Sequence, residues 1–208
     1  AITFTNKAAG EMKERLSNML GASAEDIWAM TFHAACCRIL RRYIDRCGYT
    51  SSFTIYDTSD SERLMKEILR DQGLDDKTYP PRYVLSIIGR QKDRLISPEE
   101  MEEDSRSASD YRIVQIARVY GIYQKRLKDN NALDFDDILY VTVKLLQQDR
   151  EVREYYQRKF HYVLVDEYQD TNHVQYLLTE LLAGSRRNIC VVGDDDQSIY
   201  RFRGATIE

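Results

Sequence analysis

Apolar residues gather in four short runs, at residues 1–4, 27–30, 162–165 and 189–192. Each run is continuously apolar rather than alternating with polar residues. This pattern is typical of strands in a sheet that is covered on both faces. The four runs therefore predict a buried, parallel sheet.

Amphipathic helical patterns follow these runs. The first begins near Asn6, which we expect to cap the helix; the second follows Thr31; the third opens at Thr171 or Asn172. Alternation of strands and helices predicts an α/β layer fold with right-handed crossovers.

The middle of the chain, about residues 50–132, contains helical patterns and loops but no recognisable strand. Ser59 and Glu62 have the spacing of a capping box, and Gly73 would end that helix. Pro81 begins a second helix, and Asp134 caps a later one. The acidic and Ser-rich residues 99–109 indicate a surface loop or a short solvated helix. The simplest interpretation is an all-helical insertion between strands of an α/β domain.

The composition, 43% hydrophobic and 31% charged residues with a net charge of −4, is that of an ordinary globular protein with one large or two small domains. The negative net charge argues weakly against a broadly basic surface that binds nucleic acid. It does not exclude a local basic or aromatic binding site for a single strand. No run reaches membrane-spanning length and no signal peptide opens the chain, so we expect a cytoplasmic protein without a membrane segment. The chain lacks a starting Met and opens like the end of a strand, which predicts truncation there.

The four cysteines fit no zinc-binding spacing, and no secretion signal implies an oxidising compartment. We expect buried, reduced thiols, with Cys36 and Cys190 inside apolar stretches; the full set is Cys36, Cys37, Cys47 and Cys190.

Two adjacent carboxylates, Asp166 and Glu167, end the run at residues 162–165. Ligands of open α/β sheets bind at the carboxyl ends of strands. In nucleotide hydrolases the first acid holds Mg²⁺ and the second can deprotonate the attacking water. The alternative is an acidic pair that simply ends a strand and caps the next helix.

A second polar segment follows the run at residues 189–192. Gln197 could reach the same phosphate, and Tyr200, Phe202 and Arg203 suit stacking on bases and contact with a backbone phosphate. The alternative is a turn whose aromatic rings fold into a core.

Five segments in consecutive order resemble the motifs of superfamily 1 DNA helicases of the PcrA/UvrD/Rep type. They span essentially the whole chain, and Arg201 is more similar to PcrA than to UvrD. The segments are Thr3-Phe4-Thr5-Asn6-Lys7-Ala8-Ala9, Thr31-Phe32-His33, Leu133-Asp134-Phe135-Asp136-Asp137, Asp166-Glu167-Tyr168-Gln169-Asp170-Thr171-Asn172 and Gly193-Asp194-Asp195-Asp196-Gln197-Ser198-Ile199-Tyr200.

The resemblance implies ATP and Mg²⁺ as cofactors and single-stranded DNA and its junctions with duplex as partners. Asp166 would coordinate Mg²⁺, with Glu167 completing the metal-binding pair and activating water, and Gln197 would couple the γ-phosphate to the DNA track. The implied DNA contacts are base-stacking walls from Phe4, Tyr200 and Phe202, and strand contacts from His33 and Arg203. Without the motif, a lone histidine such as His33 is more often structural. Phe202 replaces the family's Trp and loses stacking area.

The same resemblance implies a partial RecA-like parallel-sheet domain (1A) of the P-loop NTPase class with an all-helical inserted subdomain (1B). We expect residues 1–49 and 133–208 to form the two parts of 1A and residues 50–132 to form 1B. The phosphate loop G-x-x-x-x-G-K-[ST] does not occur in the sequence and would lie upstream.

The expected function is that of an ATP-dependent DNA helicase fragment, inactive when isolated, that acts with DNA repair or replication proteins. A helicase–nuclease motor segment and a degenerate binding module are the alternatives.

Overall fold

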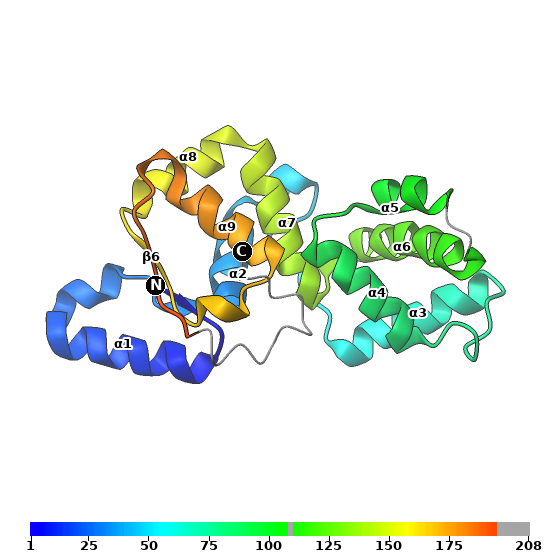
Figure 1. Cartoon of the computed structure of the whole chain (residues 1–208), viewed down its shortest axis with the longest axis horizontal. Helices are drawn as coiled ribbons and strands as arrows, with labels where there is room; N and C mark the ends of the chain where they lie inside the picture. Colours follow the sequence, from blue (N-terminus) through cyan, green and yellow to red (C-terminus); the bar gives the residue numbers. More distant parts are fainter. Residues whose placement is uncertain (108–109, 195–208) are drawn as a thin grey trace. The chain divides into compact units, whose positions relative to one another are not determined.

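A computed structural model describes residues 1–107 and 110–194 of the chain (Figure 1). The chain divides into two compact units. One consists of Ala1–Cys47 together with the chain from Val141 onward, and the other of Gly48–Tyr140.

The first unit contains a four-stranded parallel sheet of order β2-β1-β5-β6. The strands are β1 (Ile2–Thr3), β2 (Met30–Thr31), β5 (Val163–Val165) and β6 (Ile189–Val191). All four predicted strands are therefore present. The second strand begins later than the predicted residues 27–30, because only Met30 and Thr31 pair with β1, opposite Ile2 and Thr3.

Polar caps fix the starts of the helices in this unit. The Thr5 hydroxyl accepts the Ala8 N–H at 3.1 Å, so Thr5 and not the predicted Asn6 caps α1. Thr31 caps α2, which begins directly after it as predicted, and Asn172, one of the two predicted starting residues, caps α9 in a capping box. The helices are α1 (Asn6–Leu20), α2 (Phe32–Tyr43), α7 (Phe135–Gln148), which begins in the other unit, α8 (Arg150–Lys159) and α9 (His173–Ala183).

The described part of this unit also contains four short 3-10 helices: η1 (Gly21–Asp26), η2 (Ile44–Cys47), η3 (Tyr168–Asp170) and η4 (Gly184–Arg186). Within the described ranges, every helix is too short or too polar to cross a lipid bilayer.

The sheet is less buried than its apolar sequence predicts. In β5, Val163 and Val165 are buried but Leu164 between them is 44% exposed. All three residues of β6 are exposed, including Cys190. The expectation that Cys190 is a buried thiol is therefore wrong. The physical reason is that the side chains of β6 project from the two faces of the sheet, where no described helix packs extensively against this edge strand.

The second unit packs four helices around an apolar core. They are α3 (Thr58–Asp71), α4 (Pro81–Asp93), α5 (Pro98–Ser105) and α6 (Tyr111–Asp129). The centre of the core contains Met65, Ile68, Val84, Tyr120 and Tyr123, each at most 1% exposed. Pro81 begins α4 as predicted.

Two sequence expectations for this unit are wrong. The capping box of α3 consists of Asp57 and Asp60, not Ser59 and Glu62, because Asp57 lies in the extended conformation that a cap requires. The unit also contains two strands, β3 (Thr54–Ile55) and β4 (Ala132–Leu133), which pair in parallel. Strands of two residues carry no periodicity that a sequence could reveal.

A buried ion cluster joins α4 to the start of α7. Lys92 Nζ lies 2.7 Å from Asp134 Oδ2 and 2.8 Å from Asp137 Oδ1, and the Lys92 side chain is 0% exposed. The Tyr123 hydroxyl donates to Asp134 at 3.0 Å, and the Gln124 amide donates to Asp137 at 3.0 Å. Asp134 also accepts the Asp137 N–H at 2.8 Å, so it caps α7 as predicted.

Candidate nucleotide site

The carboxyl ends of the four parallel strands form one edge of the sheet. In spatial order, this edge carries His33 just after β2, Phe4 after β1, Asp166 and Glu167 after β5, and Asp194 after β6. Neighbouring strands lie about 4.8 Å apart, so the row extends over about 14 Å. Four of the predicted site residues therefore share the edge where open α/β sheets bind ligands.

The acid pair occupies the centre of this row. The Asp166 N–H donates to the Ile2 carbonyl at 3.0 Å, which holds the residue against β1. Asp166 Oδ1 accepts the Glu167 N–H at 3.0 Å. Glu167 has a φ of 52°, a left-handed conformation that costs a non-glycine residue about 1–2 kcal/mol. Such strained positions gather at functional sites, where the surrounding structure maintains them.

Electrostatics distinguish Glu167 from an ordinary surface glutamate. Partial burial raises its pKa, and the neighbouring carboxylates of Asp166 and Asp170 raise it further. A glutamate with a raised pKa is a stronger proton acceptor when ionised.

The donors at this edge suit Mg²⁺, which binds through one or two carboxylates together with water and substrate phosphates. In residues 1–107 and 110–194, no group of three or more metal-ligating side chains converges. The hydroxyl of Thr3 is buried and has no hydrogen-bond partner in the described structure. Thr3 follows Ile2, which pairs with Val165, so Thr3 lies opposite Asp166 in the strand register, and its buried hydroxyl suits a bound water.

Gln169 connects the acid-pair loop to the end of β6. Tyr168 N–H donates to the Val192 carbonyl at 2.9 Å, and the Asp194 N–H donates to Gln169 Oε1 at 3.1 Å. The Gln169 side chain is buried, with 7% exposure. Sequence analysis gave this residue no role; its only signal was its place in the motif that begins at Asp166.

The neighbouring strands contribute an aromatic pair and a histidine. The rings of Phe4 and Phe32 pack edge to face, with centroids 5.4 Å apart, and Phe32 is fully buried while Phe4 is half-buried. Burial lowers the pKa of His33 to about 4, so its imidazole is neutral near pH 7. His33 can then exchange hydrogen bonds with a ligand but cannot act there as a cation.

The other predicted site residues, Gln197, Tyr200, Phe202 and Arg203, lie outside the described residues. Their roles, like those of Phe4, His33, Asp166 and Glu167, stay predictions.

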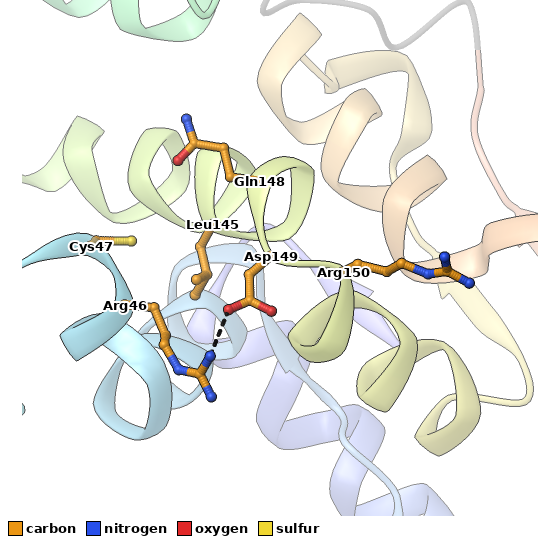
Figure 2. A pocket seen from close by; sticks show the side chains of 6 residues that line it. All are labelled: Arg46, Cys47, Leu145, Gln148, Asp149 and Arg150. Atoms are coloured by element: carbon orange, nitrogen blue, oxygen red, sulfur yellow. Dashed lines mark hydrogen bonds and ion pairs between the residues drawn. The ribbon is translucent and has the colours of Figure 1, made fainter.

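A surface hollow in the same unit has a different character. It is lined by Arg46, Cys47, Leu145, Gln148, Asp149 and Arg150, and none of these is a predicted site residue (Figure 2). Arg46 reaches Asp149 at 3.2 Å, and Arg150 points away from this pair (Figure 2). Since Asp149 also caps α8, the contact joins η2 to that helix and is structural.

Sequence comparison identifies relatives of the chain. It is 53% identical over 207 residues to the ATP-dependent DNA helicase PcrA of Bacillus subtilis (strain 168). The identity is 49% over 208 residues for PcrA of Staphylococcus aureus (strain Mu50), and 48% for PcrA of Staphylococcus epidermidis (strain RP62A). Each alignment covers the whole chain but only 28% of the relative.

The UvrD/REP helicase N-terminal domain family matches residues 1–208. The mixed α/β architecture with a parallel sheet agrees with this match. The family predicted from five sequence motifs is thereby confirmed: the chain belongs to the UvrD/REP helicases and matches their N-terminal domain.

Proposed function

We propose that this chain is part of an ATP-dependent DNA helicase and supplies the metal-binding and water-activating half of its ATPase site. The observation that carries the proposal is the acid pair Asp166–Glu167 at the carboxyl edge of a parallel sheet. The relatives support it, because each is named an ATP-dependent DNA helicase.

Each acid has a distinct role in this proposal. Bound ATP would supply the phosphoanhydride bond that is hydrolysed, and Mg²⁺ would neutralise charge on its phosphates. The Asp166 carboxylate would hold the metal, and Glu167 would assist in the metal site and accept a proton from the attacking water. The raised pKa of Glu167 supports the role of proton acceptor. Gln197 would contact the γ-phosphate and couple it to the DNA track.

The DNA track would run along the same edge. Phe4, Tyr200 and Phe202 form its base-stacking walls, while His33 and Arg203 contact the strand. The half-buried ring of Phe4 supports this assignment, because its packing against Phe32 fixes the ring without covering it completely. The low pKa of His33 implies that it binds as a neutral hydrogen-bonding group.

The proposed helicase function also implies a division of the chain into a domain and an inserted subdomain. Residues 1–49 and 133–208 form two parts of a RecA-like domain 1A, and residues 50–132 form subdomain 1B. The compactness of Gly48–Tyr140 supports a separate helical subdomain, whose boundary lies at residue 140 and not at residue 132. The intact protein would act in the cytoplasm on single-stranded DNA and its junctions with duplex, together with repair or replication proteins. The isolated chain would not turn over ATP.

A Glu167→Gln substitution in the full-length protein tests this function. We expect nucleotide affinity within about twofold of wild type and a loss of ATP turnover of about 100-fold or more, because the proton acceptor is gone. Glu11→Gln is the control, since Glu11 is exposed on α1 and lies 4.0 Å from Lys7. Undiminished turnover in Glu167→Gln would contradict the assigned role. Binding of single-stranded DNA by wild type without any turnover would favour a degenerate binding module.

A further inference from the structure

Gln169 occupies a space that exists only because residue 193 is glycine. A Cβ atom on Gly193 would lie 2.6 Å from Gln169 Oε1, and 3.3 Å and 3.4 Å from the backbone nitrogens of Gln169 and Tyr168. Real Cβ atoms do not approach other atoms as closely as 2.6 Å. The amide oxygen of Gln169 therefore fits directly against the backbone at the end of β6, where it accepts the Asp194 N–H.

This contact extends the connection between β5 and β6 beyond the strands themselves. Strand pairing between them reaches Val165 and Val191, and two further backbone bonds join Val192 to Val165 and Tyr168. The Gln169 side chain adds the next connection, to residue 194. Because Gln169 is buried, losing this bond would leave a buried polar group without a partner.

The acid pair lies within the segment that these bonds fix. Glu167 is two residues before Gln169 and adopts its left-handed conformation between β5 and η3. A left-handed glutamate persists only where neighbouring contacts maintain it. The 3-10 turn anchored by Gln169 is one of those contacts, and it includes the bond from Asp170 N–H to the Glu167 carbonyl at 3.0 Å.

We propose that Gln169 is a positioning residue that holds the loop of Asp166 and Glu167 in register with the end of β6. The inference rests on the proposed ATPase function of the acid pair. Gln169 acts through the backbone of this loop and not through contact with the nucleotide.

Two matched substitutions in the full-length protein separate positioning from general stability. Gln169→Met keeps the length of the side chain but removes the acceptor. Gln175→Met is the control, because Gln175 is also 7% exposed and its Oε1 also accepts a backbone N–H, that of Asn172, at 3.0 Å. Gln175 belongs to the capping box of α9, which is a different element from the loop of the acid pair.

The expected result is a split between the two variants. Gln169→Met should lower kcat for ATP by about 10- to 100-fold with KM changed less than about twofold, because a displaced catalytic group slows chemistry more than binding. Gln175→Met should lower the Tm to a similar degree and leave kcat within about twofold of wild type. Equal kcat in the two variants would overturn the proposal.

A second pair of variants tests the geometry. Gly193→Ala should lower kcat because its Cβ displaces the Gln169 amide. In a Gln169→Ala background the amide is absent and only the milder approach to the backbone nitrogens at 3.3 Å and 3.4 Å remains, so adding Gly193→Ala should lower kcat by a much smaller factor than it does in wild type. Independent losses, which multiply in the double variant, would contradict the proposed contact.

Hydrogen exchange at the Asp194 amide, measured on the nucleotide-free full-length protein, tests the contact without catalysis. Exchange should be at least about tenfold faster in Gln169→Met than in Gln175→Met, because only the first loses the acceptor. Equal exchange rates would overturn the positioning role. If wild type showed no ATP turnover, the proposed function would fail, while the exchange result would still decide whether Gln169 holds this loop.

Discussion

Replacing Lys92 with Met should destabilise the helical unit Gly48–Tyr140 by about 3–5 kcal/mol at pH 7.5. Methionine fills nearly the same volume as the lysine stem, so the change removes mainly the ammonium group. Two carboxylates, of Asp134 and Asp137, then lie buried without their cation, with side-chain exposures of 8% and 0%. Breaking a buried ion pair by removing one partner typically has this cost.

The loss of stability in Lys92→Met should depend on pH, and the direction of this dependence follows from the pKa of the buried carboxyl groups. Burial, and then the Asp134 charge, already raise the pKa of Asp137 to about 7 in the folded chain. Without Lys92, the carboxylates become still easier to protonate, so the variant takes up a proton when it folds. Its destabilisation should therefore shrink as the pH falls, by up to about 1.4 kcal/mol per pH unit for each proton bound.

Urea denaturation monitored by circular dichroism at 222 nm measures this effect. Trp28, the only tryptophan of the chain, lies in the other unit, so its fluorescence provides an internal control. Substituting Asp134→Asn and Asp137→Asn in the Lys92→Met background removes all three charges and should recover much of the loss. A loss below about 1 kcal/mol, or one that is the same at pH 5.5 and pH 7.5, would refute the reasoning.

Three further outcomes are expected. Asp137→Asn should flatten the pH dependence of the urea midpoint between pH 4 and 7. In this window the folded wild-type chain binds more protons than the unfolded chain, so the contribution of Asp137 to the free energy of unfolding falls as the pH rises. Phe202→Ala in the full-length protein should weaken affinity for single-stranded DNA by about 1–3 kcal/mol in a fluorescence anisotropy titration while ATP affinity is retained; unchanged DNA affinity would make the ring structural. The isolated 208-residue chain should show no DNA-stimulated phosphate release, since its sequence contains no G-x-x-x-x-G-K-[ST] loop; sustained release would contradict this.

Sequence patterns predicted the parts of the fold that depend on local chemistry. The four apolar runs correspond to the four strands of the sheet, Asp134 caps a helix as expected, and helices begin directly after Thr31 and Asn172, where the patterns place them. Predictions were wrong where tertiary pairing decides the outcome. The β3–β4 pair is two residues long and joins segments far apart in the chain, so no local pattern could indicate it.

The candidate site was likewise predictable from the sequence only in part. The acid pair was predictable because two carboxylates directly follow an apolar strand, and parallel strands bring their carboxyl ends to one edge. The role inferred for Gln169 was not predictable. It depends on the absence of a Cβ atom at Gly193 and on a hydrogen bond across 25 residues of sequence, which only coordinates reveal. The same holds for Lys92, whose partners lie more than 40 residues away.

In the proposed function, the acid pair holds the metal of a bound nucleotide. Binding of Mn²⁺ to the full-length protein in the presence of ADP, measured by electron paramagnetic resonance of the free ion, tests it most directly. Asp166→Asn should weaken this affinity at least about tenfold, while Asp149→Asn, which alters a carboxylate that caps α8, should leave it unchanged. Equal Mn²⁺ affinity in wild type and Asp166→Asn would contradict the account.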